Sequence, residues 1–265
     1  MFPFQRWMVA KSKQSKRVAA RPRSCRLAVE PLEARWLPSA FTFSTGSPDG
    51  KMATASRPAS LGKIEIESAD DFILSSETDI SQATFTGLLP AGFSASDITG
   101  VRVEIYAVFP NSSDPTRTPR VPTRTNSPSD VEVADRDTAA GDLSFGFAVL
   151  NGTFSAANSV LNGIHAAPHQ TTGGEGPRTG AEVQFQVTFT PGFDLTAGHY
   201  FFVPQVRLRH GNFFWLSTPP HQFSGDLQEW IRNGALQPDW LRVGTDIVGG
   251  SPAPTVDAAF SLSGV

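Results

Sequence analysis

Cysteine is nearly absent from this sequence, since Cys25 is the only one among 265 residues. No intramolecular disulfide can form, so packing and hydrogen bonds have to hold the fold together. Charged residues are also sparse, at 18%, whereas 39% of the residues are hydrophobic and 20 are phenylalanine. This composition excludes a disordered polyelectrolyte and indicates a chain with a sizeable core.

The sequence also lacks the common catalytic motifs. It contains no G-x-S-x-G nucleophile elbow and no H-E-x-x-H zinc motif. The glycine-rich stretch 173–180 is not followed by the Lys-Ser/Thr pair of a phosphate-binding loop. We therefore predict a protein that is not an enzyme and holds no cofactor. A glycosidase-like pair of carboxylates remains an alternative, because such residues meet only in space.

Positive charge is scarce outside the first 40 residues. Residues 1–40 contain nine Lys or Arg and two Asp or Glu, whereas residues 41–265 contain 13 basic and 23 acidic residues. An acidic body excludes nonspecific binding of nucleic acid, which needs clustered basic side chains. No apolar run is long enough for a transmembrane segment, so we expect none.

These differences divide the chain into three parts. Residues 1–40 are predicted to be a disordered basic segment for export or sorting. Residues 41–60 are rich in Ser, Thr, Gly and Pro and are predicted to be a linker. Residues 61–265 are expected to form a single folded domain.

Alternation of apolar and polar residues predicts many short strands in that domain. It is clearest over 101–107, 143–149 and 183–189, and 23 Gly and 21 Pro supply frequent turns. We predict a mainly β fold, an antiparallel β-sandwich of the jelly-roll type.

Two further elements are predicted near the C-terminal end. Two apolar segments within 197–217, separated by a break at His210–Asn212, are typical of a β-hairpin, and Pro204 should place its strand at a sheet edge or at a bulge. The spacing of Leu227, Trp230 and Ile231 between an acidic cap and a glycine predicts one short α-helix over 226–234.

Acidic residues supply the candidate metal ligands. Asp135 and Asp137 have part of the spacing of a calcium-binding loop, and Asp70 and Asp71 form a second candidate pair. Calcium is the one cofactor that these residues suggest. Ordinary roles for Asp in turns and caps are the alternative interpretation.

Tyr106 is the candidate ligand-binding residue. It alternates with apolar residues on the same strand side as Arg102 and Glu104, so its ring is predicted to be exposed, where sugar rings can stack on it. The other large aromatic residues are predicted to fill the core.

A short motif follows the basic segment. The sequence LEARWLPSA resembles the N-terminal sorting motif of extracellular proteins in planctomycete bacteria, although Pro38 stands where that motif usually has a second leucine. The resemblance implies export. The matching residues are Leu32, Glu33, Arg35, Leu37, Ser39 and Ala40.

The body of the chain is also similar to a family of uncharacterised secreted bacterial β-sandwich proteins, through phrases such as VEIYAVFP, HYFFVPQV and PDWLRVGTDIVGG. That family implies no reaction. We therefore predict an exported, non-catalytic extracellular or cell-surface protein, structural or adhesive, with extracellular polysaccharide or other surface proteins as partners. A carbohydrate-binding module is the first alternative, and a glycoside hydrolase-like enzyme is the second.

Overall fold

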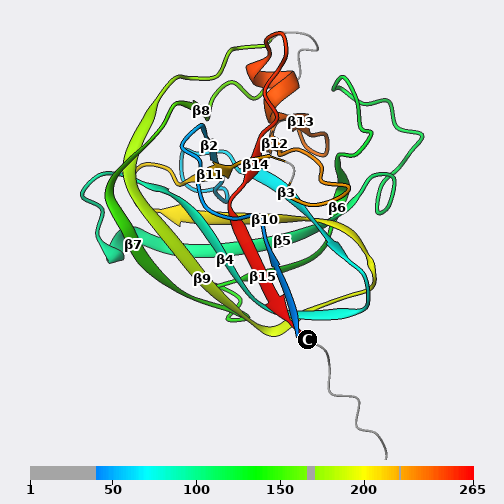
Figure 1. Ribbon diagram of the computed structural model, residues 1–265, viewed down its shortest axis with the longest axis horizontal. Helices are drawn as coiled ribbons and strands as arrows, with labels where there is room; N and C mark the ends of the chain where they lie inside the picture. Colours follow the sequence, from blue (N-terminus) through cyan, green and yellow to red (C-terminus); the bar gives the residue numbers. More distant parts are fainter. Residues whose placement is uncertain (1–39, 166–170, 221) are drawn as a thin grey trace, which may run out of the picture. The chain divides into compact units, whose positions relative to one another are not determined.

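Two β-sheets lie face to face in the computed structural model, which describes residues 40–165, 171–220 and 222–265 (Figure 1). The nine strands of the larger sheet are β1 (Phe41–Ser44), β2 (Met52–Ala55), β4 (Thr78–Leu89), β7 (Leu143–Ala156), β8 (Asn158–Val160), β9 (Arg178–Leu195), β11 (Phe214–Thr218), β14 (Asp257–Ala258) and β15 (Phe260–Gly264). The six strands of the smaller sheet are β3 (Ile66–Leu74), β5 (Ile98–Val108), β6 (Pro128–Asp137), β10 (Gly198–Leu208), β12 (Trp230–Asn233) and β13 (Leu241–Arg242).

Most neighbouring strands run antiparallel. The smaller sheet has the order β13-β12-β3-β10-β5-β6, and in the larger sheet β4 pairs with β9, β11 and β15. The pairing of β2 with β8 is parallel. The predicted antiparallel β-sandwich is therefore confirmed at the level of two packed sheets (Figure 1).

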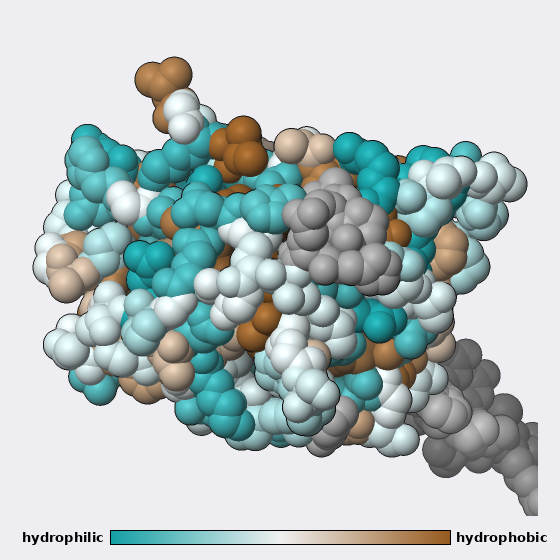
Figure 2. Space-filling view, turned by 90° about the horizontal axis from the view of Figure 1, so that it is seen from above, coloured by the Kyte–Doolittle hydropathy of each residue, from teal (hydrophilic) through white to brown (hydrophobic). Residues whose placement is uncertain are grey.

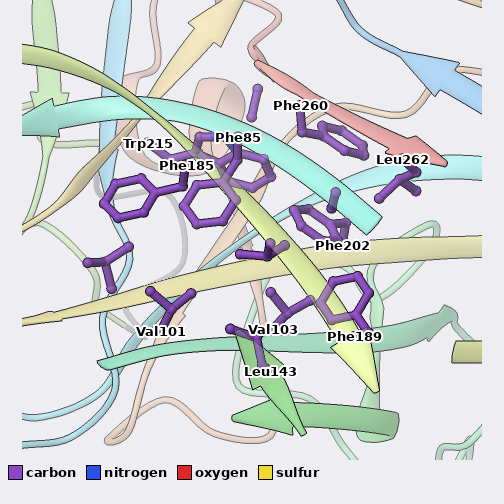
Figure 3. Close-up of a cluster of buried hydrophobic side chains, with 14 of the residues drawn as sticks. Phe85, Val101, Val103, Leu143, Phe185, Phe189, Phe202, Trp215, Phe260 and Leu262 are labelled. Atoms are coloured by element: carbon purple, nitrogen blue, oxygen red, sulfur yellow. The ribbon is translucent and has the colours of Figure 1, made fainter. Parts of the chain in front are cut away.

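Phenylalanine and tryptophan rings fill the space between the sheets (Figure 3). Phe85 on β4 stacks on Phe185 of β9 with ring centroids 5.0 Å apart. Phe202 of the smaller sheet stacks on Phe260 of the larger one at 5.1 Å. These contacts bury apolar area and hold the sheets in one relative position, as a chain without disulfides requires.

The smaller sheet is also covered on its other side, and this covering positions the candidate site. A separate group of buried residues lies on that outer face: Ala69, Tyr106, Phe201, Val203, Trp230 and Trp240. The outer face of β3, β10 and β5 is therefore not a free solvent-exposed surface.

Residues 41–60 are not a linker. β1 pairs with β15 and β2 pairs with β11, so both strands belong to the larger sheet. Met52 and Ala55 are buried in an apolar cluster. The folded unit therefore includes this segment instead of beginning at residue 61, and the Ser- and Gly-rich residues form the turns between its strands.

The predicted helix over 226–234 is wrong, because Trp230–Asn233 form strand β12. Trp230 and Ile231 are both fully buried, but they contact different apolar clusters on the two sides of the sheet. Only a strand directs adjacent side chains to opposite sides, so burial on both faces overrides the helical spacing. The helical segments of the described chain are a 3-10 turn at Ala95–Asp97 and a π-helical segment at Val243–Val248.

The predicted hairpin is also wrong, because β10 and β11 belong to different sheets. Pro204 lies in a central strand, opposite Val103 of β5. On the other side of β10, the pairs with β3 end at Phe202, and Ser56 Oγ donates to the carbonyl oxygen of Pro204 at 2.6 Å. Pro204 therefore lies just beyond the point where β3 stops pairing with β10. No β3 carbonyl there requires the backbone N–H that proline lacks.

In the part of the chain that the structure describes, no helix has the length and apolar character needed to cross a membrane.

Candidate functional site

A cavity of about 380 Å³ opens over the outer face of the smaller sheet. Its walls come from β3, β5, β6 and the segment after β12. They are lined by Glu65, Glu67, Arg102, Glu104, Tyr106, Asp130, Val131, Glu132, Arg232, Gln237 and Pro238. Charged and hydrogen-bonding groups dominate the lining, so the cavity suits a polar ligand better than an apolar one.

Strand order brings the central carboxyl groups together. Glu67 on β3 and Glu104 on β5 lie on the two sides of β10, and both carboxyl groups contact the hydroxyl of Tyr106. Tyr106 Oη lies 3.0 Å from Glu67 Oε1 and 3.0 Å from Glu104 Oε2. A phenol has only one proton to donate, so the second of these contacts requires a proton on a carboxyl group.

Glu67 is the ionised member of this carboxyl pair. Arg232 donates from Nε to Glu67 Oε2 at 2.5 Å and from Nη2 to Oε1 at 2.8 Å. Burial alone would raise the pKa of Glu67, but the charge and hydrogen bonds of Arg232 outweigh it and hold that pKa below its ordinary value. Arg232 also lies over the ring of Trp240 at 4.2 Å, which fixes the guanidinium in place.

Glu104 is the protonated member. Burial and the nearby charge of Glu67 raise the pKa of Glu104 to about 9, although Arg102 acts in the opposite direction. Arg102 Nη1 lies 2.8 Å from Glu104 Oε1, and the Arg102 side chain is itself partly exposed. At neutral pH the pair therefore carries one proton and one negative charge.

The mouth of the cavity consists of more accessible groups. Gln237 Nε2 donates to Glu65 Oε2 at 3.2 Å and to Glu67 Oε2 at 3.1 Å, which connects the mouth to the buried pair. Glu132 on β6 is exposed, and its carboxylate forms no hydrogen bond or ion pair within the described residues. The mouth of the cavity thus offers the Glu132 carboxylate as an unpaired hydrogen-bond acceptor, beside the side-chain amide of Gln237 as a donor.

The loop between β5 and β6 is held against the cavity by an arginine clamp. Arg124 Nη2 donates to both carboxylate oxygens of Asp130, at 2.5 and 2.6 Å. Arg117 bridges Asp130 at 3.1 Å and the buried Asp239 at 2.6 Å. Bidentate geometry of this kind gives a fixed orientation, so the proline-rich loop has a defined position beside the mouth.

Tyr106 is not the exposed residue that the sequence predicts. Its ring is 1% exposed and packs edge-on against Trp240 at 5.3 Å between ring centroids. The side of β5 that alternation marks as polar is covered by the clamped loop and by Trp240. The hydroxyl of Tyr106 lines the cavity wall, but no sugar can stack on the ring.

The four candidate metal ligands have protein partners instead. Asp135 Oδ2 accepts from Arg102 at 3.1 Å, and Asp137 Oδ1 accepts from the backbone N–H of Ala139 at 2.6 Å. Asp70 and Asp71 are buried and accept from the N–H groups of Ala258 and Leu227. Within the described residues no three His, Cys, Asp or Glu side chains are arranged to hold a metal ion.

Asp71 also contacts a histidine. Its Oδ2 lies 2.5 Å from His199 Nε2, within hydrogen-bond distance, and the imidazole is partly exposed. Asp70 points the other way on β3, and its pKa is raised well above the ordinary value by burial and by the charges of Asp71 and Asp257. The two adjacent aspartates therefore do not form one site.

The cavity itself was not predicted. Glu65, Glu67, Arg102 and Glu104 are visible in the sequence as polar residues alternating with apolar ones. The signal that could have identified them is the excess of ionisable residues on strands otherwise rich in isoleucine and valine.

Of the sorting motif, Leu32, Glu33, Arg35, Leu37 and Ser39 lie outside the described residues, and Ala40 is the first described one. The predicted export and the predicted family therefore stay predictions. No protein-family model, no curated protein and no solved structure matches this chain.

Proposed function

We propose that this protein is exported and acts outside the cell by binding, as an adhesive or structural surface protein, and that it binds polysaccharide at the cavity mouth. Export rests on the resemblance of the N-terminal motif. The binding role rests on one observation. The ionisable pair Glu67 and Glu104 is buried and has protein partners, whereas Glu132 and Gln237 at the mouth of the cavity are accessible.

Exposure separates the two sets of groups. Glu67 is 1% exposed and Glu104 is 2% exposed, and Arg102 forms an ion pair with Glu104. A catalytic carboxyl must touch its substrate, so this pair is suited to holding the strands in register. Glu132 and Gln237 are exposed at the mouth and can exchange hydrogen bonds with sugar hydroxyls.

Binding of the full chain to immobilised polysaccharides tests this proposal. We expect Glu132→Gln and Gln237→Ala each to weaken binding, because each removes a mouth group. Glu77→Gln is the control, because Glu77 is an exposed carboxylate away from this cavity. If no polysaccharide is retained, or if all three variants bind equally, saccharide binding at the mouth is wrong.

A glycoside hydrolase-like enzyme is the second candidate, favoured by the opposite pKa shifts of Glu67 and Glu104. A protonated and an ionised carboxyl are the pair that such chemistry uses. Both carboxyl groups are almost fully buried, however, whereas the carboxyl groups of a glycosidase must contact the sugar. Release of reducing ends by wild type, abolished in Glu104→Gln, would establish this candidate in place of the binding role.

A further inference from the structure

A basic cluster without acidic partners lies at the turn between β10 and β11, and we propose that it binds a small oxyanion such as sulfate, phosphate or carboxylate, free or carried on an acidic polymer. The cluster consists of Arg57, Lys63 and Arg178 together with the turn residues Gly211 and Asn212. It is separate from the cavity on the outer face of the smaller sheet.

Arg57 supplies the first observation. Its Nε and Nη1 atoms are inaccessible to solvent and have no hydrogen-bond partner, although the residue as a whole is only half-buried. Burial lowers the pKa of Arg57, and no carboxylate lies close enough to raise it again. Buried N–H groups on a charged side chain are costly to leave unpaired. An oxyanion beside the accessible part of the guanidinium would supply the counter-charge that this side chain lacks.

Lys63 lies near Arg57 and, like Arg57, has no carboxylate partner among the described residues. Its ammonium donates to the carbonyl oxygen of Gly211. Its pKa is lowered by burial and then by the positive charge of Arg57. The backbone bridges Arg57–Ile66 and Ser60–Lys63 place both cations on one short antiparallel segment. In a body with more acidic than basic residues, neither forms an ion pair within the described chain.

Arg178 and Asn212 line a cavity of about 300 Å³ at the same turn. The guanidinium of Arg178 lies over the ring of Phe214 at 4.6 Å, and its Nε is buried without a partner. Asn212 Oδ1 is likewise buried and has no hydrogen-bond partner among the described residues. Gly211 lines this cavity as well, which joins it to Lys63.

The chemistry of these groups selects the class of ligand. Guanidinium groups match the planar or tetrahedral arrangement of oxyanion oxygens, and an ammonium adds a point charge. No described acidic side chain forms an ion pair with any of the three cations. Glu182 lies opposite Leu88 on a neighbouring strand. Burial raises the pKa of Glu182 and no nearby cation lowers it, so Glu182 is not a counter-ion for this cluster.

Titration of the full chain with sodium sulfate, against sodium chloride at equal ionic strength, tests the proposal. We expect saturable shifts of the backbone amides of Gly211 and Asn212 and of the Nε–H signals of Arg57 and Arg178 in ¹H–¹⁵N spectra. Tm should rise with sulfate and not with chloride. Phosphate and acetate arms identify the preferred oxyanion, and dextran sulfate against neutral dextran separates a free ion from one carried on a polymer.

Matched variants locate the effect. Arg57→Gln should bind sulfate at least about tenfold more weakly than wild type, since it loses a positive charge and the guanidinium group. Lys63→Gln should do the same, and it serves as the test if Arg57→Gln fails to fold. Lys51→Gln removes an exposed positive charge at the other end of β2 and should bind as wild type does.

The proposal is overturned if sulfate, phosphate and acetate all act as chloride does, or if Lys63→Gln and Lys51→Gln bind sulfate equally. The result is independent of saccharide binding at the outer cavity, because Glu132→Gln leaves the basic cluster unchanged.

Discussion

Glu67 and Glu104 lie on the two sides of strand β10 and contact the same Tyr106 hydroxyl at 3.0 Å each, and their pKa values move in opposite directions. The pair is buried, with Arg232 on one side and Arg102 on the other. Each carboxyl thus has its own arginine, but only Glu67 depends on it for its charge. That difference gives the two glutamates unequal roles in stability.

Glu67→Gln should destabilise the protein by about 3–5 kcal/mol, because it leaves the buried guanidinium of Arg232 without its counter-charge. Glu104→Gln should cost less than about 1.5 kcal/mol, because a neutral amide replaces a carboxyl that is already protonated at neutral pH. Urea unfolding at about pH 7 measures both. Equal losses in the two variants would contradict the assignment of the proton to Glu104.

Stability should fall as pH rises from about 4.5 toward about 8, in part because of Glu229. Burial raises the pKa of Glu229 to about 8 from an ordinary value of 4.5. Between these two pKa values the folded protein holds a proton that the unfolded chain releases. The stabilisation is therefore fully present below the unfolded-chain value of 4.5 and is lost as the pH rises through the folded-state value of about 8.

Glu229→Gln isolates this effect, since the amide keeps a hydrogen-bonding partner for Thr54 and does not titrate. Its unfolding free energy should change less than that of wild type between about pH 5 and about pH 8. The pKa of Asp70 is also raised, and Asp70 remains in the variant. The unfolding free energy of the variant should therefore still depend on pH to some extent. An unchanged slope in Glu229→Gln would show that its carboxyl is not the titrating group.

The arginine clamp should control the loop between β5 and β6. Arg124→Gln removes a bidentate, buried contact to Asp130, so we expect a loss of about 3 kcal/mol and faster proteolytic cleavage within 109–127. Arg209→Gln is the control, because Arg209 is exposed and lies outside this loop, and it should cost less than about 1 kcal/mol. Limited proteolysis and urea unfolding distinguish the two, and equal sensitivity would refute the clamp.

Gly87 is placed where no side chain fits. A Cβ atom there would overlap the ring of Phe213 and the carbonyl oxygen of Phe214. Gly87→Ala should therefore destabilise by about 1–3 kcal/mol or more, whereas Gly146→Ala, with open space around it, should change stability by less than about 0.5 kcal/mol. Thermal melts of the two alanine variants provide the comparison.

The strands could be predicted because their pattern is local. Alternation over 101–107, 143–149 and 183–189 lies within β5, β7 and β9, as predicted. The helix predicted over 226–234 is wrong because a strand that is buried on both faces loses the alternation of apolar and polar residues. Trp230 and Ile231 are both buried, which mimics a helix face when only spacing is considered.

The candidate site could not be predicted because it depends on strand order. Glu67 and Glu104 are separated by 37 positions and meet only because β10, from much later in the chain, inserts between β3 and β5. Tyr106 was correctly assigned to the polar side of its strand. The error was to treat that side as exposed, since residues that cover it come from 109–127 and from Trp240.

The pairing of β1 with β15 has a mechanical consequence. Phe41 lies directly opposite Gly264, so the first and last strands of the larger sheet are joined at the same end. Tension applied between those two residues would open the β1–β15 ladder one hydrogen bond at a time, as a zipper opens, instead of shearing all of its bonds together. The protein pulled in this way would yield first at β1 and would keep the stacked rings between its sheets intact until β15 separated from β4.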